Sequence, residues 1–208
     1  MIETYFGMKC NPFRKGFEQK NKFESLDFKE IQGRLEYLQK IHGIGLFTGS
    51  PGLGKTYSIK YFLDNLNVGL YKPIYLSLST VTVMDFYKGL CFGLGITPMH
   101  RKVDMFKQIQ DTIKTYVKDR KITPVVVIDE AHVFIDEKFP IALDFMYQLA
   151  KRIRKYNGMQ IVITHNIKDF VGSEEIARKS TAIINACQYS FVFSLAPNDM
   201  DDLCTLYE

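Results

Sequence analysis

The chain has 208 residues, of which 46% are apolar and 24% are charged, and this balance excludes a long disordered or low-complexity protein. Lys and Arg outnumber Asp and Glu by 27 to 23, and the net charge of +4 permits an anionic partner without requiring one. The four cysteines are scattered without metal-binding spacing, so we expect free thiols. The longest apolar runs are far shorter than the roughly 20 residues of a membrane-spanning helix. The first residues lack the pattern of a secretory signal, and we expect a cytoplasmic protein without a membrane segment.

Short apolar runs alternate with helical patterns along the chain, which is typical of a parallel sheet with crossover helices. The expected strands cover residues 44–48, 73–78, 124–128, 160–164 and 188–195. The expected helices cover about residues 59–66, 83–94, 101–118 and 142–153, with a further helix after Ser173. The prediction is an α/β fold with a P-loop NTPase core, in which helices flank a five-stranded, mainly parallel sheet.

The chain reads as a single domain, because no repeat and no Pro/Gly/Ser-rich linker divides it. We expect residues 1–43 to form an N-terminal extension and a first helix. Residues 44–196 would then form the nucleotide-binding core, and residues 197–208 a C-terminal tail.

A phosphate-loop motif, G-x-x-x-x-G-K-[ST], follows the first expected strand and precedes an amphipathic helix. The residues of this motif are Gly49, Ser50, Pro51, Gly52, Leu53, Gly54, Lys55 and Thr56, and we add the adjacent Tyr57 to the expected nucleotide-binding set. Glycines let the backbone N–H groups wrap around a phosphate chain at the positive end of a helix. Lys55 would reach the β- and γ-phosphates of ATP, and the Thr56 hydroxyl would ligate Mg²⁺. The alternative is a glycine-rich turn without a ligand.

Two adjacent acids, Asp129 and Glu130, end the apolar run 125–128. Ligands bind at the carboxyl ends of strands in open α/β sheets, so these acids fall where a nucleotide would lie. Asp129 would hold Mg²⁺ as a Walker-B aspartate, and Glu130 would orient or deprotonate the attacking water. The alternative is a helix N-cap followed by a surface acid. Together with the phosphate loop, the pair favours hydrolysis over passive binding.

The expected strand 160–164 also ends in polar residues, where a P-loop ATPase places a side chain that senses the γ-phosphate. We favour His165 for this role, then Asn166, then Thr164. A turn or N-cap function for Asn166 is the alternative.

Basic residues suggest two further roles. Arg178, with Lys179 beside it, could reach the γ-phosphate bound by a neighbouring subunit, as could Arg154; the alternative for each is a solvated cation. A DNA-facing surface could contain Lys88, Arg101, Lys102, Lys114, Lys118, Arg120 and Lys121. Cations on exposed helix faces are common, and no sequence-reading DNA motif accompanies these residues.

The first part of the chain, to about residue 132, resembles the AAA+ ATPases of bacterial transposition and general secretion. The matching segments are Tyr5-Phe6-Gly7, Asn11-Pro12-Phe13, Phe23-Glu24-Ser25, Arg34-Leu35-Glu36-Tyr37-Leu38, the phosphate loop with the strand before it, and residues 71–76 and 80–94. The resemblance implies an ATP-dependent homo-oligomer on double-stranded DNA that recruits or licenses a transposase. It also implies that the segment from Phe6 to Phe13 packs near the adenine.

From about residue 125 onward, the chain resembles the conjugative type IV secretion ATPases. The matching segments are residues 149–158, 163–167 and 190–199, with Thr164-His165-Asn166 where that family usually reads T-Q-N. No AAA+ lid is recognisable after Leu195, so we expect the lid to be absent or truncated. The two resemblances meet at the strand ending in Asp129-Glu130, which suggests a hybrid chain, natural or artificial.

The leading interpretation is a Mg²⁺-dependent ATPase that acts on DNA in a mobile-element process such as transposition. One alternative is an ATPase that powers conjugative transfer with a transfer-machinery protein as partner. Another alternative is a nucleotide-gated binding module with little turnover.

Overall fold

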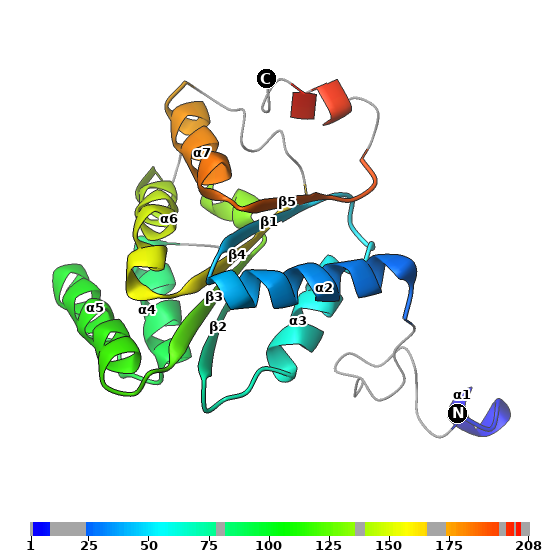
Figure 1. The fold of residues 1–208 in the computed structure, drawn as a ribbon, viewed down its shortest axis with the longest axis horizontal. Coiled ribbons are helices and arrows are strands. Elements are labelled where there is room, and N and C mark those ends of the chain that lie inside the picture. The colour runs from blue at the N-terminus through cyan, green and yellow to red at the C-terminus, as the bar shows by residue number, and fades with distance from the viewer. Residues whose placement is uncertain are drawn as a thin grey trace.

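The computed structural model describes residues 2–8, 24–77, 82–135, 140–165, 174–195, 199–201 and 203–204. Its centre is a five-stranded sheet in the order β2-β3-β4-β1-β5 (Figure 1). The strands are β1 (Ile44–Thr48), β2 (Tyr71–Ser77), β3 (Thr123–Asp129), β4 (Met159–Ile163) and β5 (Tyr189–Val192). Every strand pairing within the described residues is parallel. The predicted five-stranded α/β fold is confirmed, with a sheet that is parallel rather than mainly parallel.

Helices cover both faces of this sheet (Figure 1). These helices are α2 (Leu26–Ile41), α3 (Lys55–Asp64), α4 (Val83–Leu94), α5 (Lys102–Lys118), α6 (Pro140–Arg152) and α7 (Glu174–Ala186), with 3₁₀ turns η2 (Ala131–Phe134) and η3 (Ile153–Tyr156). The short helix α1 (Ile2–Tyr5) lies away from the sheet (Figure 1). Helices α2 and α3 pack on one face, and α4 to α7 pack on the other. No helix in these described segments is long and apolar enough to cross a membrane.

Strand β3 shows why the run 123–129 lies in the middle of the molecule. All seven of its residues are buried. Its side chains alternate between the two helical layers: Val125 and Val127 join the core under α2 and α3, whereas Val126 and Ile128 join the core under α4 to α7. A strand that is buried on both faces needs the continuous β-branched run that the sequence contains.

Local signals set the limits of several helices. The Ser25 hydroxyl accepts a hydrogen bond from the Phe28 N–H at 3.1 Å and caps α2, while Thr82 caps α4 through the Asp85 N–H at 3.2 Å. Helix α4 ends at Gly95, whose φ of 77° is a left-handed conformation that glycine adopts without a steric cost. These caps explain why α4 spans the predicted residues 83–94.

The fifth strand is shorter than the predicted 188–195. After Val192, the chain leaves the sheet and runs beside the phosphate loop: the Phe193 N–H donates to the Thr48 carbonyl at 2.9 Å, and the Ser194 carbonyl faces Ser50. The backbone of residues 193–194 therefore supports the loop that follows β1.

Candidate nucleotide-binding site

The phosphate loop connects β1 to α3 and is fixed by close packing against the chain after β5. A Cβ atom at Gly49 would lie 2.5 Å from the Phe193 Cβ, so only glycine fits there. The Ser50 N–H and hydroxyl both contact the Ser194 carbonyl, at 3.4 and 3.3 Å. Gly54, with φ at 81°, turns the chain into the first residue of α3. The loop is thus placed at the N-terminus of a helix, where backbone N–H groups can bind an anion.

Lys55 is folded into this loop. Its Nζ donates to the carbonyls of Gly49 at 2.6 Å and Ser50 at 2.9 Å, and the residue is 4% exposed. Burial lowers the pKa of Lys55, while the negative charges of Glu130 and Asp129 act in the opposite direction. A buried ammonium with two carbonyl partners can exchange them for phosphate oxygens, which are stronger acceptors.

Thr56 and Asp129 meet across the gap between α3 and β3. The Thr56 hydroxyl lies 3.1 Å from Oδ2 of Asp129, whose side chain is 3% exposed. The Glu130 N–H donates to Oδ1 at 3.1 Å, and the Tyr75 hydroxyl donates to Oδ2. Burial, followed by this hydrogen bond, raises the pKa of Tyr75 far above its ordinary value. A hydroxyl and a carboxylate in contact are the oxygen donors that Mg²⁺ prefers, so the residues fit this cation.

Glu130 is directed toward His165 at the end of the neighbouring strand. The Glu130 backbone has φ at 57°, which is uncommon for a residue with a side chain. Its Oε2 lies 2.6 Å from Nε2 of His165 and 3.5 Å from Nδ1 of His132, and the two imidazole rings are 5.6 Å apart. Strand β4 pairs with β3, so His165, two residues after the end of β4, reaches this carboxylate directly.

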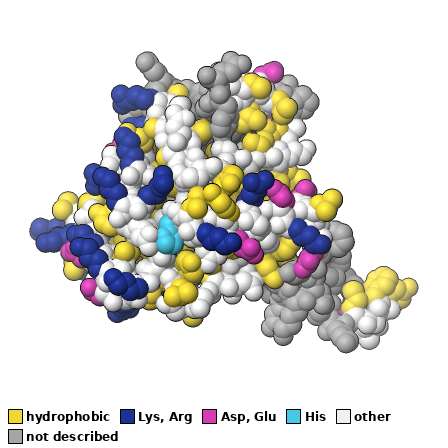
Figure 2. Space-filling view, in the orientation of Figure 1, with side chains coloured by type: hydrophobic (Ala, Val, Ile, Leu, Met, Phe, Trp, Pro, Cys, Tyr) yellow, Lys and Arg dark blue, Asp and Glu magenta, His cyan; other side chains and the backbone are white. Residues whose placement is uncertain are grey.

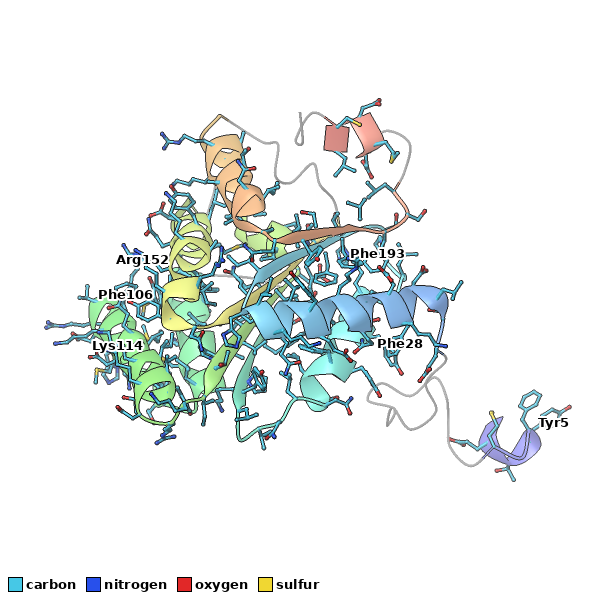
Figure 3. The ribbon with its side chains drawn as sticks, viewed as in Figure 1. Tyr5, Phe28, Phe106, Lys114, Arg152 and Phe193 are labelled. Carbon is cyan, nitrogen blue, oxygen red and sulfur yellow. The ribbon has the colours of Figure 1, made fainter. Side chains whose placement is uncertain are left out.

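The structure therefore brings five predicted residues to one edge of the sheet, at the ends of β1, β3 and β4: Lys55, Thr56, Asp129, Glu130 and His165. Tyr57, on α3, is 38% exposed, with its ring 6.1 Å from that of Phe28. Figure 3 shows Phe28 on α2 and Phe193 after β5, on the side of the molecule that holds the phosphate loop.

Other predicted residues lie elsewhere or outside the described chain. Asn166 and Phe13 are outside the described residues. Phe6 is 68% exposed, and Figure 3 shows its neighbour Tyr5 away from the sheet, so packing of this segment near an adenine stays a prediction. Arg178 is exposed on α7, and Lys179 forms an ion pair with Asp144 at 3.2 Å.

The candidate DNA-binding cations lie on α4, on α5 or directly beside α5. Figure 2 shows many Lys and Arg side chains on the part of the molecule that α5 and α6 form. Arg152, Arg154 and Lys155 of α6 and η3 are also exposed. These three precede β4, at the end of the sheet opposite the phosphate loop, so Arg154 does not lie beside the nucleotide site of its own chain.

Sequence reasoning did not predict a site role for Tyr75 or His132. Tyr75 lies inside strand β2, where no sequence motif marks it as a site residue. Its contact with Asp129 arises from the register of β2 beside β3. His132 lies three residues after Asp129, in the turn η2. Its closeness in sequence to the two acids was the signal that could have identified it.

A phosphate loop on β1, acids at the end of β3 and a polar residue after an intervening β4 define a P-loop nucleotide-binding domain. The AAA domain family model matches residues 39–168, more than half of the chain, and the chain belongs to this family. This match crosses the junction at about residue 130, so the family assignment does not depend on a hybrid origin, which stays a prediction.

Solved structures share the fold at low sequence identity. Cdc6p from Pyrobaculum aerophilum is 14% identical with a TM-score of 0.56, over 98% of this chain and 52% of that one. VirB4 of Thermoanaerobacter pseudethanolicus is 15% identical with a TM-score of 0.53, over 78% and 80%. A chain of Drosophila ORC bound to DNA is 8% identical with a TM-score of 0.53, over 84% and 95%. The chain thus spans about half of the Cdc6p chain. No curated protein sequence matches it significantly.

Proposed function

We propose that the chain binds ATP with Mg²⁺ and hydrolyses it, and that residues 44–196 form the catalytic core. The observation that carries this proposal is the meeting of two pairs at one edge of the sheet: Thr56 with Asp129, and Glu130 with His165. The first pair supplies oxygen ligands for a divalent cation. The second pair combines a carboxylate that can accept a proton with a polar side chain that can report on the γ-phosphate.

The proposed roles follow from the contacts of each side chain. Lys55 exchanges the Gly49 and Ser50 carbonyls for oxygens of the β- and γ-phosphates. Thr56 and Asp129 would hold Mg²⁺, which when bound would neutralise charge that develops on the phosphates. Glu130 orients the attacking water and accepts its proton. His165 fixes the Glu130 carboxylate and lies where a terminal phosphate would be sensed.

We further propose that this activity serves a mobile-element process on double-stranded DNA, as in transposition. The support is the resemblance of the N-terminal part of the chain to transposition-type ATPases, together with the exposed cations of α5 and α6. Assembly of several copies would concentrate the modest net charge of +4 along one DNA. In such an oligomer, Arg178 of one copy would reach the γ-phosphate of the next, and a transposase would be the protein partner. We place this activity in the cytoplasm.

A second candidate is an ATPase of conjugative transfer, which the residues from 149 onward favour by their resemblance to that family. A third candidate is a nucleotide-gated module with little turnover, which loss of the lid after β5 would favour. The structure describes residues 193–195, 199–201 and 203–204 of this part, and the predicted loss of the lid stays a prediction.

The testing experiment measures ATP turnover with and without duplex DNA, with oligomeric state recorded by light scattering in the same samples. We expect turnover that requires Mg²⁺ and rises with DNA, together with ATP-dependent retention on DNA that weakens steeply with salt. Binding of ATP without turnover at any protein or DNA concentration would favour the gated module. Turnover without retention on DNA, even at low salt, would remove the transposition proposal.

A further inference from the structure

Tyr75 places its hydroxyl against the Asp129 carboxylate from the neighbouring strand. It lies on β2, where it pairs with Val127, two residues before Asp129. The hydroxyl donates to Oδ2, which is also the oxygen that Thr56 contacts at 3.1 Å. The Lys60 ammonium lies 5.0 Å from the centre of the Tyr75 ring and covers it from α3. A half-buried phenol thus reaches a carboxylate that has almost no access to solvent.

The protein contacts both oxygens of Asp129. The Glu130 N–H donates to Oδ1 at 3.1 Å, while Tyr75 and Thr56 donate to Oδ2; the Thr56 hydroxyl is also 3.4 Å from Oδ1. The Thr56 hydroxyl has one donor and two lone pairs, so it can donate to Asp129 and still give a lone pair to a cation. Among the described residues, Tyr75 and Thr56 are the side-chain donors to Oδ2, and only Tyr75 has no role as a cation ligand. Because Asp129 is 3% exposed, water would not readily replace a lost donor.

We propose that Tyr75 is a positioning residue, which orients the Asp129 carboxylate for a divalent cation and favours Mg²⁺ over Ca²⁺. A phenol is protonated at neutral pH, so Tyr75 can donate to Asp129. Tyr75 and Thr56 occupy both lone pairs of Oδ2, so Asp129 offers a cation a single-point contact through Oδ1, which suits the small Mg²⁺ ion with its retained waters. Ca²⁺ more often takes both oxygens of a carboxylate.

This inference rests on the proposed function, because it assigns Tyr75 to the cation site of that function. The inference and the proposed function can be tested separately, because they depend on different residues. Nucleotide binding without metal needs the phosphate loop and should not depend on Tyr75. Metal affinity in the presence of nucleotide should depend on it.

The test compares Tyr75→Phe with Tyr71→Phe, a matched control on the same strand and the same face. The Tyr71 hydroxyl has no hydrogen bond among the described residues, and its ring packs in the core under α2 and α3. Binding of Mn²⁺ in the presence of ADP is measured by electron paramagnetic resonance, with Mg²⁺ and Ca²⁺ as competitors. Binding of a fluorescent ADP analogue is measured separately in EDTA. Asp129→Asn and the double variant Tyr75→Phe/Asp129→Asn complete a mutant cycle.

We expect Tyr75→Phe to weaken Mn²⁺ binding about tenfold, the lower end of the range for groups that orient metal ligands. Competition by Mg²⁺ should weaken relative to competition by Ca²⁺, and metal-free nucleotide binding should match that of Tyr71→Phe. In the Asp129→Asn background, Tyr75→Phe should cause no further loss, because its action passes through that carboxylate.

Two results would overturn the inference alone: unchanged Mn²⁺ affinity in Tyr75→Phe while Asp129→Asn is weakened, or an equal loss with and without the Asp129 carboxylate. A variant with damaged packing would be recognised by its loss of metal-free nucleotide binding. Failure of the wild-type chain to bind Mn²⁺ with ADP would overturn the proposed function together with the inference.

Discussion

Replacing Glu130 with Gln tests whether this carboxylate accepts the proton of the attacking water. The substitution keeps the size of the side chain, and the amide can still contact Nε2 of His165, which lies 2.6 Å from the present carboxylate. Loss of a general base typically slows a reaction by 10²–10⁴, which corresponds to about 2.7–5.5 kcal/mol in the activation barrier. We therefore expect the turnover number to fall by about 10²–10⁴.

ATP affinity should change little in the same variant. Glu130 makes no hydrogen bond to residues 49–56 in the described chain, so we expect a dissociation constant within about threefold of wild type, or about 0.65 kcal/mol. The assay combines steady-state phosphate release with equilibrium binding of a fluorescent ATP analogue. Glu36→Gln, which removes the same charge from the exposed face of α2, is the control and should leave both quantities unchanged. Turnover above one-tenth of wild type, or loss of binding together with turnover, would refute the assigned role.

Three further predictions concern the sensor, the phosphate loop and the thiols. His165→Ala should slow turnover by about ten- to a hundredfold with ATP affinity retained, because it removes the side chain that contacts the Glu130 carboxylate. Phosphate-release and ATP-binding assays measure the two quantities. Gly49→Ala should destabilise the fold by about 1–3 kcal/mol, because the added Cβ would overlap Phe193. Gly33→Ala, in open space on α2, should stabilise the fold by about 0.5–1 kcal/mol. Thermal unfolding measures both, and a shift of the melting temperature in the same direction for the two variants would contradict the prediction. Burial raises the pKa of Cys187 to about 12, so at pH 8 in the folded protein iodoacetamide should modify the exposed Cys204 before Cys187, as peptide mass spectrometry can determine.

The parts of the site that the sequence predicted are those with short-range signals. The phosphate loop needs glycines at fixed offsets, and all of its residues lie between Gly49 and Thr56. Asp129 and Glu130 could be placed because a β-branched run predicts a buried strand and the acids directly follow it. His165 was predicted by the same argument, applied to the expected strand 160–164. Each of these predictions uses only residues adjacent in the chain.

The contacts between strands could not be obtained in this way. The order β2-β3-β4-β1-β5 depends on how four crossover connections pack, which no local pattern specifies. The hydrogen bond from Tyr75 to Asp129 requires β2 and β3 to pair with Tyr75 opposite Val127; a slip of one residue would turn the tyrosine to the other face. The early end of β5 likewise follows from a tertiary constraint, the packing of Phe193 against Gly49.

The strand order also links the proposed sensor to both halves of the site. Strand β4 lies between β1, which carries the phosphate loop, and β3, which carries the acids, and it pairs with both. At its end, the Thr164 N–H donates to the Phe47 carbonyl of β1 at 2.9 Å, while His165 contacts Glu130 after β3. A displacement of the loop by bound phosphates would therefore reach Glu130, the proposed base, through two consecutive residues. Because His165 contacts the carboxylate directly, it can couple occupancy of the loop to the orientation of Glu130 without a large movement of the domain.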